Sequence, residues 1–149
     1  GLESRGLGDV YKRQLKYDTP ELMSEIDMCV RNYQNKNAMN RIQEGYSFNW
    51  WTQDYKEGDI HNEHHHNVGQ ISGVYYVRAN ENAGGIMFRN PNPFVEYGHT
   101  MRDSAPYSWQ EYVYQPIKGR ILMFPSYLKH QVLPSKKDCI RTVIAFNVR

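Results

Sequence analysis

The hydrophobic and polar positions divide the chain into one helical segment followed by a longer β-rich segment. Between residues 19 and 37, apolar residues recur every three to four positions: Leu22, Ile26, Cys29 or Val30, and Tyr33. Thr19 can cap the first turn, and Pro20 suits the first helical position. The pattern predicts one amphipathic packing helix over residues 19–37, with no catalytic group on it.

From residue 46 onward, short runs of β-branched and aromatic residues are separated by turn residues. The runs predicted as strands include residues 46–51, 71–77, 86–88, 111–117, 121–126, 130–134 and 140–148. Residues 118–120 are expected to form a tight turn between two strands, and residues 91–106 a long polar loop. About eight short strands at regular spacing predict a single sandwich or barrel, since the chain has no internal repeat.

The first fourteen residues differ in pattern from the rest. Their string GLGDVYKRQ resembles a translated sequencing adapter, and a disordered native arm is the alternative. Residues 1–14 are therefore expected to be a non-native or disordered leader outside the fold. Residues 15–149 are expected to form the single domain.

Histidines cluster in the string HNEHHH at residues 61–66. Neutral imidazole is the commonest protein ligand for first-row metals. Side chains two apart on a strand share a face, so His64 and His66 can hold one ion while His65 points away. In an unbroken strand, His61 faces with His65. Taken alone, the cluster also fits a solvated polar loop.

Two further residues support a buried site. His130 follows a buried strand and a proline turn, and Arg141 is the single charge in the apolar run of residues 139–148. A buried guanidinium needs an anion in good geometry, and arginine binds carboxylates through two hydrogen bonds. Arg141 therefore fits the carboxylate of a cosubstrate, whereas pairing with a protein carboxylate or exposure at a strand edge is the structural alternative.

These motifs together resemble a bacterial and phage group of 2-oxoglutarate–Fe(II) oxygenases. The resemblance lies in four motifs in order, from about Tyr46 to Asn147: His64-His65-His66, the SGVYYV string at 72–77, FPS at 124–126 with His130, and Arg141 with AFN at 145–147. It implies a mainly β, double-stranded β-helix fold of the jelly-roll or cupin type, with one N-terminal packing helix.

The resemblance also implies an enzyme that couples oxidative decarboxylation of 2-oxoglutarate to oxidation of a substrate, as in a hydroxylase. His64, His66 and His130 would hold Fe(II), and Arg141 would bind the distal carboxylate of 2-oxoglutarate. Tyr76 is similar to the tyrosine that donates to this carboxylate in related prolyl hydroxylases. Tyr75 is expected to pack in the core. Thr142 and Asn147, together with Trp50, Trp51 and the loop at 91–106, are further candidates for lining the site or meeting the substrate.

One departure from the common pattern concerns the middle ligand. The usual facial site has two histidines and one carboxylate, whereas His66 stands at the carboxylate position here. Glu63 precedes the first ligand and does not restore the pattern. A third neutral imidazole leaves the site one unit more positive. The alternatives are a three-histidine cupin-type dioxygenase that uses no 2-oxoglutarate, and a metal- or sugar-binding barrel without turnover.

Composition narrows the partners and the compartment. The net charge of +2 with no basic face argues against nucleic acid, so a small molecule or peptide is the expected substrate. No apolar run is long enough for a membrane helix, and no secretory signal pattern is present. Cys29 and Cys139 lie far apart without metal-site spacing, which favours a cytoplasmic location. The sequence does not define the substrate or the oligomeric state.

Overall fold

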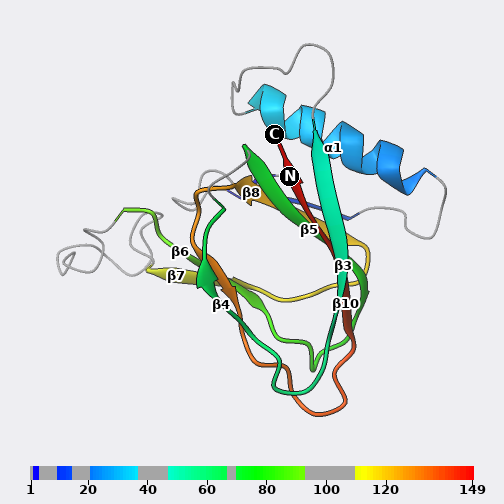
Figure 1. Ribbon diagram of the computed structural model, residues 1–149, viewed down its shortest axis with the longest axis vertical. Helices are drawn as coiled ribbons and strands as arrows, with labels where there is room; N and C mark the ends of the chain where they lie inside the picture. Colours follow the sequence, from blue (N-terminus) through cyan, green and yellow to red (C-terminus); the bar gives the residue numbers. More distant parts are fainter. Residues whose placement is uncertain (1, 4–9, 15–20, 37–46, 67–69, 93–109) are drawn as a thin grey trace.

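The computed structural model describes residues 2–3, 10–14, 21–36, 47–66, 70–92 and 110–149. These residues form one helix and two antiparallel β-sheets that face each other (Figure 1). The larger sheet has the order β1-β2-β8-β5-β10-β3, formed by β1 (Leu2–Glu3), β2 (Val10–Gln14), β8 (Arg120–Pro125), β5 (Ile71–Ala79), β10 (Arg141–Val148) and β3 (Phe48–Tyr55). The smaller sheet has the order β4-β9-β6-β7, formed by β4 (His61–His64), β9 (His130–Val132), β6 (Ile86–Arg89) and β7 (Glu111–Tyr114).

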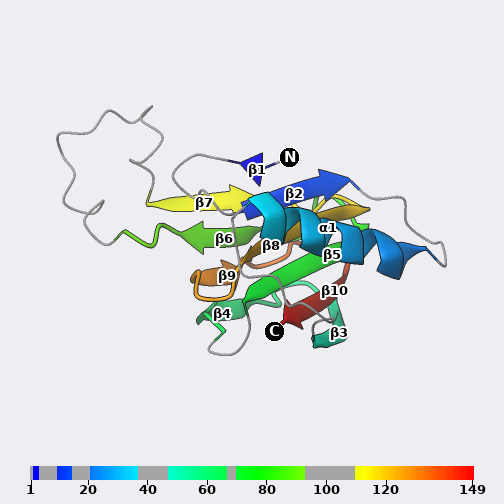
Figure 2. The same cartoon turned by 90° about the horizontal axis from the view of Figure 1, so that it is seen from above.

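The single helix, α1 (Leu22–Lys36), packs on the outer face of the larger sheet (Figure 2). The predicted apolar stripe of α1 is confirmed, because Ile26, Cys29, Val30 and Tyr33 are at most 1% exposed. They contact side chains from β5, β8 and β10, including Tyr75 and Phe146. Core packing of Tyr75 is therefore confirmed. Thr19 and Pro20 lie outside the described residues.

A second apolar core fills the space between the two sheets. The side chains of β5 alternate between the two cores, because successive residues of a strand point to opposite faces. Tyr75 lies in the core below the helix, whereas Val74 and Tyr76 lie between the sheets. The alternation places Ser72, Val74 and Tyr76 on one face of β5, and it directs their side chains toward the interior where the candidate site lies.

The tight turn predicted at residues 118–120 is present, since the N–H of Arg120 donates to the carbonyl of Ile117, but the strands on its two sides do not pair with each other. β7 pairs with β6 in the smaller sheet, whereas β8 pairs with β5 and β2 in the larger sheet. The connection between them crosses from one sheet to the other and includes Gly119 at φ 81°, whose N–H donates to the carbonyl of Tyr76. Local pattern indicated two strands and a turn, but the pairing partners lie far away in sequence.

The structure also differs from the expected exclusion of residues 1–14 from the fold. β2 pairs with β8 in the register Tyr11–Met123 to Gln14–Arg120, and Val10 is fully buried between the sheets. The exclusion is corrected for residues 10–14. The non-native origin of the leader stays a prediction.

Other boundaries shift modestly. β3 continues to Tyr55, four residues beyond the predicted end at 51, and this extension supplies side chains to the site. The predicted loop at 91–106 lies outside the described residues from 93 onward. Among the residues the structure describes, no helix has the length and apolar character that crossing a membrane requires. In the described part of the chain, neither Cys29 nor Cys139 forms a disulfide.

Candidate metal and cosubstrate site

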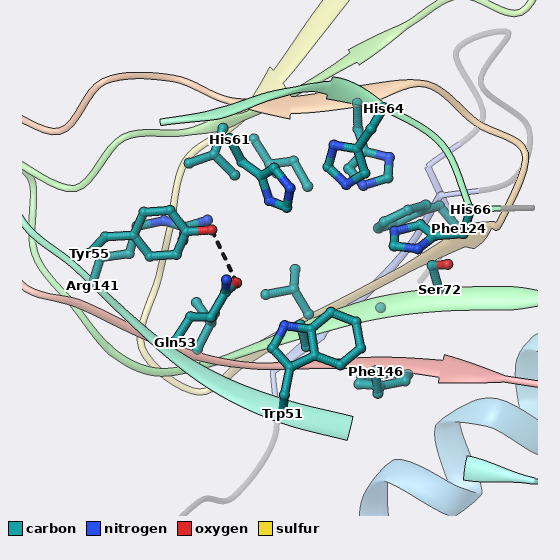
Figure 3. A pocket seen from close by; sticks show the side chains of 17 residues that line it. Trp51, Gln53, Tyr55, His61, His64, His66, Ser72, Phe124, Arg141 and Phe146 are labelled. Carbon is teal, nitrogen blue, oxygen red and sulfur yellow. Dashed lines mark hydrogen bonds between the residues drawn. The ribbon is translucent and has the colours of Figure 1, made fainter. Parts of the chain in front are cut away.

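A cavity between the two sheets brings together residues from both halves of the domain (Figure 3). It encloses about 480 Å³, including its open mouth. Its lining comprises the polar side chains of Gln53, Tyr55, His61, His64, His66, Ser72, His130 and Arg141, and an apolar wall of Trp51, Gly73, Val74, Ile86, Phe124, Val132, Val143, Ala145 and Phe146. A concave site with an apolar wall and a few convergent polar groups is typical of a small-ligand pocket.

Three of the predicted residues converge at one end of this cavity. His64, His66 and His130 each offer one ring nitrogen, and these nitrogens lie within 4.8 Å of one another. His64 and His130 are direct partners across the β4–β9 pair, and their ring centroids are 4.2 Å apart. His66 follows β4, and its backbone N–H donates to the carbonyl of Ser126 over 2.8 Å. Antiparallel pairing and one anchoring hydrogen bond thus assemble the cluster from distant segments.

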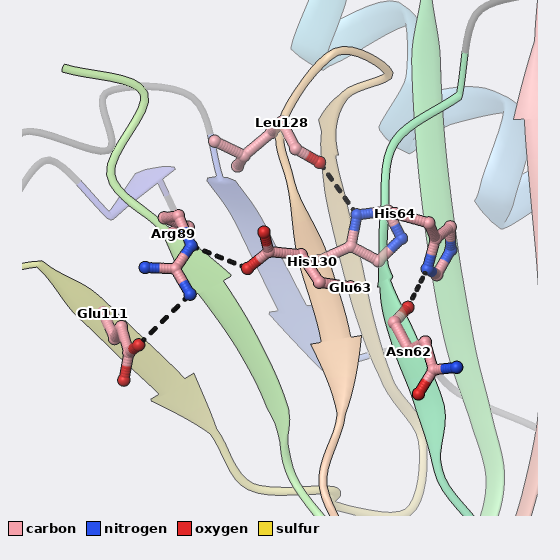
Figure 4. A network of polar contacts seen from close by, with 7 residues as sticks. All are labelled: Asn62, Glu63, His64, Arg89, Glu111, Leu128 and His130. Atoms are coloured by element: carbon pink, nitrogen blue, oxygen red, sulfur yellow. Dashed lines mark hydrogen bonds and ion pairs between the residues drawn. The ribbon is translucent and has the colours of Figure 1, made fainter. Parts of the chain in front are cut away.

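Backbone carbonyls orient two of the three imidazoles (Figure 4). His64 Nδ1 lies 2.6 Å from the carbonyl oxygen of Asn62, and His130 Nδ1 lies 2.8 Å from that of Leu128. A carbonyl oxygen can only accept, so each Nδ1 carries the proton and donates. The lone pair of each ring is therefore on Nε2, which is the arrangement that second-sphere hydrogen bonds give to metal-binding histidines.

The electrostatics of the cluster favour neutral rings. Burial, assisted by the charges of neighbouring histidines and opposed by the Leu128 carbonyl, lowers the pKa of His130 to about 3. Burial and the neighbouring histidines also lower the pKa of His66. Desolvation disfavours the charged imidazolium. Near neutral pH, both rings are in the deprotonated form that a metal ion requires.

Arg141 lies at the other end of the cavity and is 3% exposed. Its Nε donates to the carbonyl of Gly84 over 3.1 Å, and its guanidinium carbon lies 4.0 Å from the ring centroid of Tyr55. Its Nη1 is buried without a hydrogen-bond partner, and in the described part of the chain no carboxylate forms an ion pair with it. An unsatisfied buried cation of this kind fits an incoming anion.

The hydroxyl of Tyr76 provides a second unsatisfied group near Arg141. Tyr76 is fully buried, and its hydroxyl has no hydrogen-bond partner. The Arg141 guanidinium carbon lies 5.5 Å from the Tyr76 ring centroid. Burial raises the pKa of Tyr76, although the charge of Arg141 opposes this shift. The hydroxyl therefore stays protonated and can donate, as the resemblance to prolyl hydroxylases implied.

Several residues of the cavity were missed by the sequence reasoning. The parity argument placed His61 with His65, but the register shifts between His61 and His64, so His61 faces the cavity with its ring centroid 4.0 Å from that of His64. Gln53 and Tyr55 were missed because β3 was predicted to end before them. The alternation from Trp51, a candidate that does line the cavity, would have indicated both had the strand been extended.

The remaining candidates lie elsewhere. Glu63 pairs with Arg89 at 2.6 Å, away from the cluster, so it supplies no ligand (Figure 4). Thr142 donates to Asp54 and accepts from Arg78 in an exposed network. Asn147 accepts a hydrogen bond from Ser72 over 2.7 Å and lies behind that cavity residue. Trp50 is 54% exposed and does not line the cavity.

The residues of the cavity fit Fe(II) and 2-oxoglutarate, the two groups that the resemblance implies. Three imidazoles suit a first-row metal ion and leave coordination positions open. The unpartnered Arg141 Nη1 and Tyr76 hydroxyl suit one carboxylate. A two-sheet β fold with three convergent imidazoles opposite a buried arginine defines the class of double-stranded β-helix metal-dependent oxygenases.

Comparison with known families identifies the group within this class. Residues 49–147 match the family model described as "Putative 2OG-Fe(II) oxygenase", and the chain belongs to this family. Fe(II) and 2-oxoglutarate are thus its cofactors, which confirms the expectation from sequence. No curated protein matches the chain.

Solved structures confirm the double-stranded β-helix fold. A Pseudomonas putida prolyl-4-hydroxylase aligns with TM-score 0.58 at 15% identity, over 93% of this chain and 71% of that one. A Burkholderia pseudomallei oxidoreductase of the 2OG-Fe(II) oxygenase family aligns with TM-score 0.59 at 11% identity, over 93% and 65%. A Trichoplax adhaerens prolyl hydroxylase, in complex with a hypoxia inducible factor peptide fragment, aligns with TM-score 0.53 at 19% identity, over 93% and 62%. The chain therefore spans only about two thirds of these proteins.

Proposed function

We propose that the protein oxidises a small-molecule or peptide substrate, with Fe(II) held by His64, His66 and His130 and 2-oxoglutarate anchored by Arg141 and Tyr76. The observation that supports this proposal is that the imidazole cluster and the unsatisfied Arg141 guanidinium lie in one cavity. Fe(II) with 2-oxoglutarate and oxygen supplies the oxidative decarboxylation and the oxidant for the substrate.

The chain's own residues bind, orient and protect the reactants. Arg141 Nη1 and the Tyr76 hydroxyl would donate to the carboxylate far from the metal, because both are buried donors without partners. The carbonyls of Asn62 and Leu128 keep Nε2 of two ligands available. The apolar wall, which includes Phe124 and Phe146, would exclude water from the reacting centre.

The expected substrate class and cellular location rest on the cavity, the net charge and the two cysteines. A cavity with an apolar wall and a few convergent polar side chains suits a small ligand or a single side chain of a peptide. The net charge of +2 provides little attraction for nucleic acid. The two thiols, which form no disulfide and one of which is on the buried face of α1, support a reducing cytoplasmic environment.

Succinate formation tests the proposal. Protein loaded with Fe(II) is incubated with 2-oxoglutarate and oxygen, and succinate is measured over time. We expect slow succinate formation even without substrate, with 2-oxoglutarate binding measured in parallel by calorimetry on Mn(II)-loaded protein.

Arg141→Ala separates this proposal from a three-histidine dioxygenase that needs no 2-oxoglutarate. Loss of a charged hydrogen-bonding partner is expected to weaken 2-oxoglutarate binding by about tenfold to a hundredfold while Mn(II) still binds. Failure of the metal-loaded wild-type protein to bind 2-oxoglutarate would show that the proposed function is wrong.

A further inference from the structure

A fourth histidine, His61, lines the cavity without belonging to the ligand cluster. β9 residues His130 and Val132 share a face, and their partners across the pair are His64 and His61. Because the register shift adds one residue to β4 between these pairs, both histidines of β4 face inward. The His61 ring stacks on that of His64 at 20° with centroids 4.0 Å apart, so its nitrogens do not join the three that converge.

His61 lies between the imidazole cluster and Arg141 (Figure 3). His61 and Tyr55 also border a second, open hollow, which Asp59 and Ile60 help to form. His61 therefore lies between the main cavity and this open hollow.

A dicarboxylate that spans the cavity from the metal to Arg141 must pass His61. At the Arg141 end, two buried donors already face the distal carboxylate. At the metal end, the polar side chains that line the cavity are the three ligands, Ser72 and His61. Nδ1 of His64 and of His130 faces a backbone carbonyl, and the Ser72 hydroxyl donates to Asn147, so His61 is the side chain there with a donor still to place. The keto acid offers only acceptors, whereas a neutral imidazole keeps one N–H to donate.

We infer that His61 is a cosubstrate-binding residue that donates a hydrogen bond to the keto acid end of 2-oxoglutarate from the open side of the cavity. This inference rests on the proposed function. It also explains a structural feature that metal binding alone does not require, namely the extra residue in β4 that turns His61 inward.

Binding measurements on Mn(II)-loaded protein test this role without turnover. His61→Phe keeps a ring that can stack on His64 but removes the N–H. We expect its 2-oxoglutarate affinity to fall about tenfold, with Mn(II) affinity unchanged within about twofold. His61→Gln, which restores an N–H of similar reach, is expected to recover most of the affinity. His65→Phe is the matched control, because His65 is an exposed neighbour that does not line the cavity.

A second keto acid identifies the end of the molecule that His61 contacts. 2-Oxopentanoate has the same chain length but lacks the distal carboxylate. We expect His61→Phe to weaken both keto acids by a similar factor, and Arg141→Ala to weaken 2-oxoglutarate alone.

The outcomes separate the inference from the proposed function. Wild-type affinities in His61→Phe, beside an Arg141→Ala variant that has lost 2-oxoglutarate binding, would overturn the role of His61 and leave the proposed function intact. Lost Mn(II) affinity in His61→Phe would overturn it as well, because His61 would then support the metal ligands. No 2-oxoglutarate binding by the wild-type protein would overturn both.

Discussion

Single residues at the Arg141 end of the cavity combine burial with missing partners. A buried hydroxyl or guanidinium N–H without an acceptor destabilises the folded state by about 1–3 kcal/mol. The Tyr76 hydroxyl and Arg141 Nη1 are both in this position. Such groups lower the stability of the folded protein, and under the proposed function a bound carboxylate would satisfy both of them.

Tyr76→Phe is therefore expected to have opposite effects on stability and binding. Removal of the unsatisfied hydroxyl leaves the free energy of unfolding unchanged or raises it by about 1 kcal/mol. The affinity for 2-oxoglutarate falls about fivefold or more, because one donor is lost. Thermal unfolding with and without Mn(II) and 2-oxoglutarate measures both effects. A variant that is both less stable and normal in binding would contradict the assignment.

The low pKa of His130 predicts that acid destabilises the metal-free protein. The unfolded chain binds a proton near pH 6.5, whereas the folded chain does so only near 3, so stability is lost as pH falls through this window. Between pH 7.5 and 5.5, His130 is expected to lower the free energy of unfolding by about 1 kcal/mol. Urea unfolding in chelator at both pH values measures the fall.

His130→Gln provides the control for this pH dependence. The variant has no titrating group at 130, so its stability is expected to fall less than that of the wild type over the same window. An equal fall in both proteins would assign the effect to other groups. His66, whose pKa is also lowered, is expected to contribute in the same direction.

At the scale of strands and turns, the position of Arg141 depends on a glycine turn from the facing part of the chain. The carbonyl of Gly84 accepts from Arg141 Nε, and the N–H of Gly84 donates to the Ser135 hydroxyl over 2.9 Å. A Cβ at Gly84 would lie 1.9 Å from the backbone oxygen of Leu133. The absence of a side chain thus allows two backbone segments to approach and hold the arginine.

Gly84→Ala is expected to disturb both stability and cosubstrate binding. Because the clash is with backbone, the segment must shift, and we expect a loss of about 2–3 kcal/mol in the free energy of unfolding with weaker 2-oxoglutarate binding. Gly58→Ala is the control, since Gly58 has φ 80° but open space around it. That variant should lose about 1 kcal/mol through backbone strain and bind 2-oxoglutarate normally. Equal binding in both variants would contradict this role for Gly84.

At the scale of the whole molecule, the two apolar cores have different roles. The core below α1 stabilises the larger sheet from outside, whereas the core between the sheets leads directly into the cavity. Apart from Phe146, which also lines the cavity, changes below the helix are expected to alter global stability without changing the site.

Ile26→Ala tests this division. Ile26 is 1% exposed, and its truncation is expected to lower the free energy of unfolding by about 2–4 kcal/mol. Met28→Ala on the same helix, 41% exposed, should change it by less than about 0.5 kcal/mol. Chemical denaturation measures stability, and Mn(II) titration of the folded proteins should give equal affinities. A reduced affinity in Ile26→Ala would show that the outer core does influence the site.

The sequence alone determined the features that local patterns encode. A spacing of three to four residues defined the buried face of α1, and alternation defined the inward face of β5, because helix and strand geometry fixes which side chains share a face. The shared face of His64 and His66 was likewise visible in the sequence, as was the single charge of Arg141 in an apolar strand. Their joint role came from the order of motifs shared with a known family.

Only the tertiary structure decided which distant segments meet. The separation of β7 and β8 into different sheets depends on pairing with β6 and β5, which no local pattern encodes. The inward orientation of His61 depends on one extra residue in β4 relative to β9. Such a shift belongs to the pair of strands, so it cannot be read from the sequence of one strand alone. Periodicity fixes the face of an unbroken element, whereas partner choice and bulges arise from contacts across the fold.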